Sequence, residues 1–165
     1  MILKIISEKI NTVVEVILFS MLVTMTIAVF LQILFRYLLN APLYWTEELS
    51  RYLMIWIVYL GSSVGIKRGA HVGFSYFVNL VGPKIANWFY MMSFLGIAAF
   101  CVNITYYGLI VALRNMKQLS PALQLPIGFV YMALPVAGVL CLIQLMPLII
   151  NTYKKITTKS FEIMS

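Results

Sequence analysis

Charged residues gather at the start of one strongly apolar segment of the chain. Glu47, Glu48 and Arg51 lie in the stretch WTEELSRY, directly before the apolar run that begins at Tyr52. Carboxylates are favourable at the positive end of a helix, and Glu47 and Arg51 are four residues apart, the spacing of an ion pair along one helix face. With Thr46 as the N-cap, a capped and internally neutralised helix start explains part of this pattern.

The second interpretation of the same charges is a directional contact with a neighbouring helix or subunit. The apolar run from Tyr52 to Ile66 is too short to cross a bilayer, so a spanning helix must begin near Thr46 and place Arg51 partly inside the membrane. An ion pair at that depth gains little net stability, because desolvation offsets the attraction. Arg36, four residues after Gln32, closes the preceding apolar segment at the same level and can join the contact.

Side chains that commonly carry catalysis or bind metals are few and isolated in the sequence. Cys101 and Cys141 stand alone, and His71 is the only histidine, with no second ligand at a suitable spacing. The sequence contains no Cys-x-x-Cys pair, no nucleophile motif and no Gly-rich phosphate loop. We therefore predict no enzyme activity, no metal and no cofactor, and we interpret both cysteines as small buried apolar side chains.

Composition indicates an integral membrane protein. The 165 residues are 62% hydrophobic and only 10% charged, whereas about a quarter of the residues of a soluble domain are charged. A soluble core of this size could not bury so much apolar surface, but a lipid bilayer can.

Charge clusters separate long apolar segments that are suited to crossing a bilayer. A spanning helix needs about 20 apolar residues, and backbone groups in lipid must be satisfied internally. We predict an all-α integral membrane protein with a single membrane domain, 1–165, and four transmembrane helices at 13–38, 46–66, 85–113 and 126–153. The second span reaches this length only if it includes Glu47, Glu48 and Arg51. Pro135 lies inside the fourth span and is expected to kink it.

Two weaker patterns lie around the end of the second span. Phe74, Phe77, Val78 and Val81 follow helical spacing, which predicts a short interfacial amphipathic helix at 71–82; a continuation of the second span is the alternative. Glycines recur every fourth residue at Gly61, Gly65, Gly69 and Gly73. Such a stripe lets another helix approach closely, either within this chain or in a partner subunit.

The distribution of basic residues predicts the orientation. Eight Lys and Arg residues fall on one side of the predicted spans: Lys4, Lys9, Lys67, Arg68, Lys84, Lys154, Lys155 and Lys159. Four fall on the other: Arg36, Arg51, Arg114 and Lys117. Both termini should therefore face the cytoplasm. We attribute the net charge of +7 to the orientation of the spans and to contact with anionic membrane lipids. We expect no nucleic acid partner.

The predicted spans lack an ionisable group near the bilayer midplane. Such a group costs about 2.5–3.5 kcal/mol and is normally kept for function. Glu15 is the nearest candidate, but it lies in the first turn of the first span, where it can reach the headgroups. The mid-membrane polar residues are uncharged and are expected to form interhelical hydrogen bonds: Thr24, Thr26, Gln32, Asn103, Thr105 and Gln144. One possible function, kept as an alternative, is a self-contained four-helix exporter of small molecules. Such an exporter would need an acidic residue near the bilayer midplane.

Two segments carry a resemblance to a known family. FRYLLNAPLYWTEELSRYLMIWIVYLGSSVGIKRGAHV and SPALQLPIGFVYMALPV resemble the small, four-helix membrane subunits of tripartite ATP-independent periplasmic (TRAP) transporters. Together with the four spans, the resemblance covers nearly the whole chain. It implies a non-catalytic scaffold subunit of a sodium-coupled secondary importer of organic acids, of the dicarboxylate or sialic acid class.

The resemblance also implies partners and a location. The partners are a large multi-span transport subunit, in which sodium coupling is expected, and a periplasmic substrate-binding protein, at the bacterial inner membrane. Candidate contacts with these partners are Arg36, Trp45, Glu47, Glu48, Arg51, Gly61, Gly65, Lys67, Arg68 and His71. Arg36, Glu47, Glu48 and Arg51 would then lie on the periplasmic side.

Overall fold

Helices form most of the described part of the chain. The computed structural model describes residues 2–68 and 83–161. The predicted interfacial helix at 71–82, together with Gly69, His71 and Gly73, lies outside the described residues. The helices are α1 (Ile2–Tyr37), α2 (Tyr44–Lys67), α4 (Pro83–Arg114), α5 (Gly128–Tyr131) and α6 (Ala133–Phe161).

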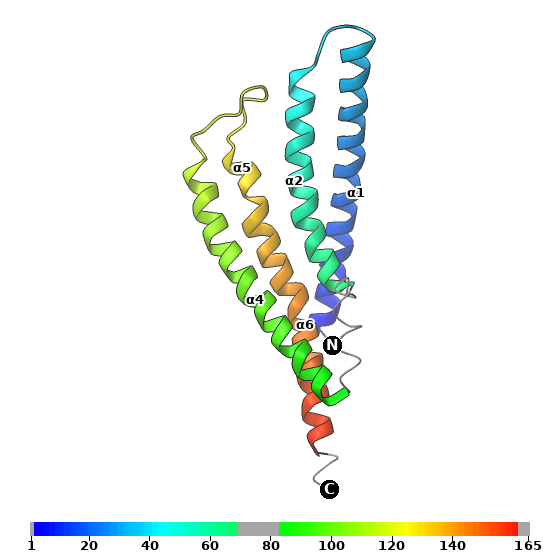
Figure 1. Cartoon of the computed structure of the whole chain (residues 1–165), viewed down its shortest axis with the longest axis vertical. Coiled ribbons are helices and arrows are strands. Elements are labelled where there is room, and N and C mark those ends of the chain that lie inside the picture. The colour runs from blue at the N-terminus through cyan, green and yellow to red at the C-terminus, as the bar shows by residue number, and fades with distance from the viewer. Residues whose placement is uncertain (1, 69–82, 162–165) are drawn as a thin grey trace.

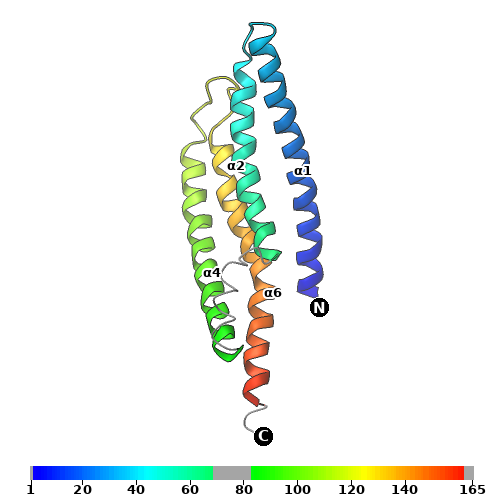
Figure 2. The same ribbon diagram turned by 45° about the vertical axis from the view of Figure 1, so that its right-hand side comes forward.

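The helices run roughly side by side as an elongated bundle (Figure 1). α2 and α6 lie in the middle, with α1 on one flank and α4 on the other, as both ribbon views show (Figure 2). The main contacts join α4 to α6, α1 to α2, and α2 to α6, whereas α1 touches α6 only slightly. α1 is therefore held mainly by α2, its neighbour in the chain.

Within residues 2–68 and 83–161, four helical stretches are long and apolar enough to cross a membrane: Ile5–Tyr37, Tyr44–Lys67, Ala86–Arg114 and Gly128–Lys154. Most of their apolar surface is exposed in the isolated chain. Such surface is unfavourable in water and suited to lipid or to another membrane protein. The predicted class, an all-α membrane protein with four spans, is confirmed.

Two helices extend beyond the apolar segments from which the sequence predicts spans. α1 begins at Ile2 rather than near residue 13, and α6 continues to Phe161 rather than ending near residue 153. The added part of α1 buries Ser7 and Asn11. Charge clusters mark where the apolar surface ends, but a helix can continue past that point while it still packs on a neighbour.

The fourth span is interrupted near Pro135. α5 ends at Tyr131 and α6 begins at Ala133, with Met132 between them. Proline has no backbone N–H, so Pro135 cannot donate to the Tyr131 carbonyl, and the regular bonding resumes with Val136, which donates to Met132 O at 3.2 Å. Pro147, by contrast, lies inside α6 without ending it.

Small residues bring α4 and α6 close together. A Cβ on Gly138 would lie 2.2 Å from Thr105 Oγ1 and 3.0 Å from the Cys101 carbonyl oxygen, so only glycine fits there. Cys101 and Cys141 are buried in the same apolar cluster and carry free thiols, as predicted. Gly61 differs, because nothing lies within 4 Å of the position its Cβ would take. At Gly61, packing within this chain is therefore the wrong interpretation of the glycine stripe.

Candidate subunit interface

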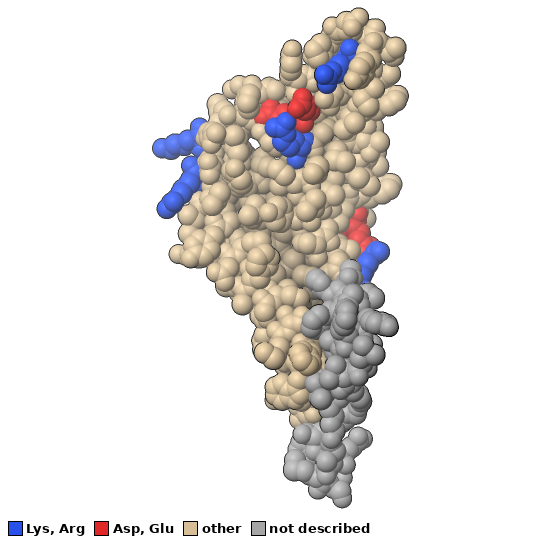
Figure 3. Space-filling view, viewed as in Figure 1, with Lys and Arg blue, Asp and Glu red and all other residues tan. Residues whose placement is uncertain are grey.

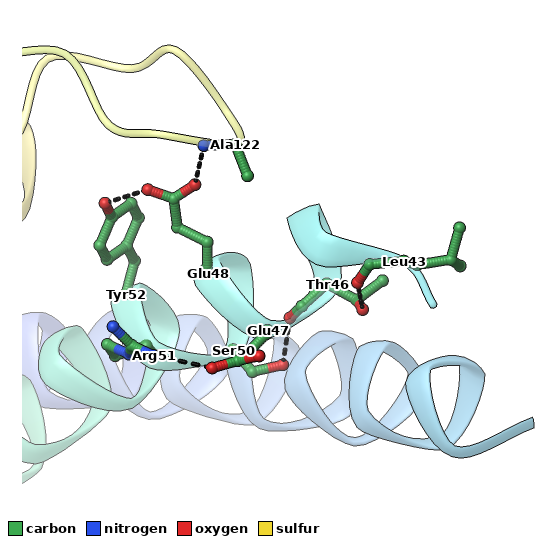
Figure 4. A network of polar contacts seen from close by, with 8 residues as sticks. All are labelled: Leu43, Thr46, Glu47, Glu48, Ser50, Arg51, Tyr52 and Ala122. Atoms are coloured by element: carbon green, nitrogen blue, oxygen red, sulfur yellow. Dashed lines mark hydrogen bonds and ion pairs between the residues drawn. The ribbon is translucent and has the colours of Figure 1, made fainter. Parts of the chain in front are cut away.

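Glu48 connects the start of α2 to the loop between α4 and α5. Its side chain is buried, and one carboxylate oxygen accepts hydrogen bonds from the backbone N–H groups of Ala122 and Leu123, at 2.8 Å each. The other oxygen accepts a hydrogen bond from the Tyr52 hydroxyl (Figure 4). Hydrogen bonds to a charged acceptor are stronger than neutral ones, and they compensate a buried charge. Glu48 thus fixes the loop on α2.

Thr46, two residues before Glu48, does not cap α2, contrary to the sequence prediction. α2 begins at Tyr44, two residues earlier, and Leu43 occupies the N-cap position without a side-chain hydrogen bond. Thr46 is fully buried and donates its hydroxyl to the Leu43 carbonyl at 2.7 Å. Because the helix starts earlier, Thr46 is already inside the first turn.

Glu47 and Arg51 form the predicted ion pair, but at the surface. The Arg51 Nη2 to Glu47 Oε1 distance is 2.9 Å, and the side chains are 67% and 58% exposed, respectively. An exposed pair of this kind contributes about 0–1 kcal/mol, so it does little for the fold. Arg36 does not join this pair. Its guanidinium carbon lies 5.9 Å from the ring centroid of Tyr37, and neither ion pair of the described residues includes it.

One face of α2 collects several predicted interface residues. Helical spacing places Glu47, Arg51, Met54, Val58, Gly61 and Gly65 within one arc, which we name the α2 outer stripe. Met54 and Val58 are exposed, and the space beyond Gly61 is open. The opposite face contains the buried residues of α2: Thr46, Glu48, Leu60, Ser63 and Ile66. At Met54, Val58 and Gly61, the described residues of this chain therefore leave the stripe uncovered.

Trp45 lies on a different side of α2 from the α2 outer stripe. It lines a cleft at the same end of the molecule as the Glu47–Arg51 ion pair. The cleft has a volume of about 580 Å³ and is lined by Pro42, Leu43, Tyr44, Trp45, Pro121 and Ala122. The loops that precede α2 and follow α4 both contribute to it. Trp45 is 42% exposed, so much of its ring can be reached from outside.

The other end of α2 is tied to α1. Arg68 donates to Glu15 Oε1 from Nη2 at 2.7 Å and from Nε at 3.2 Å, and Asn11 Nδ2 donates to the same oxygen at 2.6 Å. The pairing of Glu15 with Arg68 could not be predicted from the sequence, in which Glu15 is expected to reach the headgroups and Arg68 to be an interface candidate. Lys67 takes part in neither ion pair of the described residues, and His71 lies outside them.

Mid-membrane polar residues divide into two groups. Gln144 meets the expectation of an interhelical hydrogen bond, because it accepts from the buried Ser7 hydroxyl and so joins α6 to α1. For four residues the expectation is wrong, because each donates to a carbonyl four residues earlier in its own helix: Thr24, Thr26, Asn103 and Thr105. That carbonyl lies within reach of a short side chain without any help from a second helix. For Gln32 the interhelical hydrogen bond stays a prediction.

Charged side chains on the face seen in Figure 3 form a few separate groups, with a broad uncharged surface between them. Among residues 2–68 and 83–161, no group of three or more His, Cys, Asp or Glu side chains could hold a metal ion. The charged side chains of this face are therefore confined to a few places on an otherwise uncharged surface (Figure 3).

Sequence comparison identifies the family. The sequence pattern of the DctQ component of tripartite ATP-independent periplasmic transporters matches residues 25–155. The chain belongs to this family. It is therefore a transporter permease subunit and not an enzyme.

Individual relatives agree with this family. A TRAP transporter small permease protein of Haemophilus influenzae is 32% identical over 143 residues, which cover 87% of this chain and 89% of that protein. The sialic acid TRAP transporter small permease protein SiaQ of Vibrio cholerae is 27% identical over 152 residues, 92% and 88% of the two chains. The isethionate TRAP transporter permease protein DctMQ of Oleidesulfovibrio alaskensis is 34% identical over 105 residues, 62% of this chain and 16% of that protein.

Proposed function

We propose that this TRAP small subunit is a non-catalytic scaffold in a secondary importer of organic acids, and that the α2 outer stripe contacts a large transport subunit. The observation that carries the proposal is the exposure of the Glu47–Arg51 ion pair on the same face as the open space at Gly61. A glycine with free space above it lets a second helix approach closely, and an ion pair can set that helix in register.

The DctMQ relative supports a partner of this kind. This chain matches only 16% of that permease protein. A segment like this chain therefore occurs inside a much longer permease polypeptide. We infer that this small subunit sits beside a large multi-span subunit, which carries the substrate and the sodium coupling. We propose no cofactor for the small subunit.

The remaining features of the complex follow from the same proposal. The proposed location is the bacterial inner membrane with both termini in the cytoplasm, and both described ends lie toward the same end of the bundle (Figure 1). The Trp45 cleft and the loop fixed by Glu48 would then face the periplasm, where a substrate-binding protein docks. Organic acids of the sialic acid or dicarboxylate class are the proposed substrates.

Purification from native membranes tests the function. In mild detergent, the tagged chain is expected to bring down a much larger membrane protein, and only the complex should drive uptake of organic acids in proteoliposomes. Uptake by the small subunit alone would overturn the scaffold proposal, since the transport site would then lie in this chain.

A further inference from the structure

An apolar groove runs along α1 on the side where it faces α2 and α6. Its volume is about 460 Å³, and its lining is Lys9, Ile10, Val13, Val14, Ile17, Met21, Trp56, Leu60, Val136 and Leu140. The groove exists because α1 packs mainly on α2 and reaches α6 only slightly, with the Ser7–Gln144 hydrogen bond as one link. Lys9 is the one charged residue of this lining, and because the lining is wholly apolar, Lys9 contributes its hydrocarbon stem to it.

The size of the groove fits a hydrocarbon chain. From Lys9 to Met21 the helix rises about 18 Å, close to the roughly 15 Å thickness of one leaflet of the hydrocarbon core. An apolar cavity of about 150 Å³ already binds benzene, and this groove is larger. A helix of the same length would occupy roughly 1,400 Å³, so the groove cannot take up a whole partner helix.

The position of Lys9 indicates which headgroup a hydrocarbon chain in this groove would carry. Lys9 is exposed at one end of the groove and takes part in neither ion pair of the described residues. Glu15, a nearby acid on the same helix, is already paired with Arg68 at 2.7 Å. Basic pockets between membrane helices attract anionic lipid headgroups. We propose that this groove holds one acyl chain of an anionic phospholipid, with its phosphate bound by Lys9.

Two variants separate the acyl chain from the headgroup. Val13→Trp fills the groove at a position that is 59% exposed, so the larger side chain does not disturb the core. Its matched control is Val16→Trp, which is 65% exposed on the same helix but outside the lining. Lys9→Gln removes the headgroup contact. Its control is Lys154→Gln, an exposed lysine of α6 that does not line the groove.

Native mass spectrometry of the delipidated full chain measures binding directly. The added probes are phosphatidylglycerol, phosphatidylcholine with the same acyl chains, and inorganic phosphate. The unmodified chain and both controls should retain one phosphatidylglycerol and no inorganic phosphate. Val13→Trp should bind phosphatidylglycerol and phosphatidylcholine about tenfold more weakly. Lys9→Gln should reduce the preference for phosphatidylglycerol over phosphatidylcholine by about fivefold.

Three outcomes would overturn the proposal. Equal retention by Val13→Trp and Val16→Trp would show that the lipid binds elsewhere. Equal binding of the two lipids, with no effect of Lys9→Gln, would remove the anionic headgroup from the site. Loss of a co-purifying membrane protein in Val13→Trp, with unchanged lipid retention, would show that side chains of a partner occupy the groove.

Discussion

At the residue scale, two adjacent glutamates of α2 have opposite surroundings. Glu47 points outward and pairs with Arg51, whereas Glu48 points inward and binds backbone N–H groups of a distant loop. The first contact could be predicted, because a spacing of four residues is a local property of any helix. The second could not, because its donors are backbone groups 74 and 75 residues away, and backbone groups leave no mark on the sequence.

The two glutamates should respond differently to mutation. Glu48→Ala leaves the N–H groups of Ala122 and Leu123 without their acceptor, so hydrogen exchange of these two amides should become about tenfold faster or more. Hydrogen exchange followed by mass spectrometry measures this rate. Glu47→Ala is the control and should leave both amides protected. Equal exchange in the two variants would mean that the carboxylate of Glu48 does not hold the loop.

A charge swap distinguishes the two interpretations of the Glu47–Arg51 ion pair. Glu47→Arg combined with Arg51→Glu keeps a pair within the helix but reverses its direction toward a neighbour. If the pair contacts the large subunit, the swapped chain should insert normally and co-purify with that subunit several-fold less well. Normal co-purification and normal uptake would favour the simpler interpretation, a self-neutralised helix start.

At the element scale, glycines have different uses in α2 and α6. Gly138 of α6 has neighbours at 2.2 and 3.0 Å from the position of a Cβ, whereas Gly61 of α2 has open space. The spacing of the α2 glycines predicted close helix packing, but it could not reveal where that packing occurs. In a membrane protein, faces that meet lipid and faces that meet a partner are both apolar, so the hydrophobic pattern does not separate them.

Substitutions at these two glycines should have opposite effects. Gly61→Leu should leave the thermal unfolding of the isolated chain in detergent unchanged and strongly reduce co-purification of the large subunit. Gly138→Ala should destabilise the isolated chain by about 1–3 kcal/mol, because the added methyl group meets the α4 backbone. A lower melting temperature for Gly61→Leu would show that this face is packed inside the chain.

At the scale of the whole molecule, the four spans could be predicted from the charge clusters that separate long apolar segments, because backbone groups in lipid must be satisfied internally and such segments therefore form helices. The helix ends could not. α1 continues almost to the N-terminus because its first turns pack on neighbouring helices, beyond the apolar surface that hydropathy detects. The interruption before Pro135 could be predicted, since the missing N–H is a property of that residue.

The orientation can be tested by labelling from one side. In a chain with Cys101→Ala and Cys141→Ala, a cysteine at Lys117 should react with a membrane-impermeant maleimide added to intact spheroplasts, because the α4–α5 loop should face the periplasm. A cysteine at Lys154 should react only after the membrane is opened. The reverse pattern would invert the proposed topology.

Glu48 holds the loop between α4 and α5 through two main-chain N–H groups. Any amino acid except proline supplies the N–H that Glu48 needs at positions 122 and 123. The side chains at these two positions can therefore change, and with them the shape of that rim, while the anchorage to α2 stays intact.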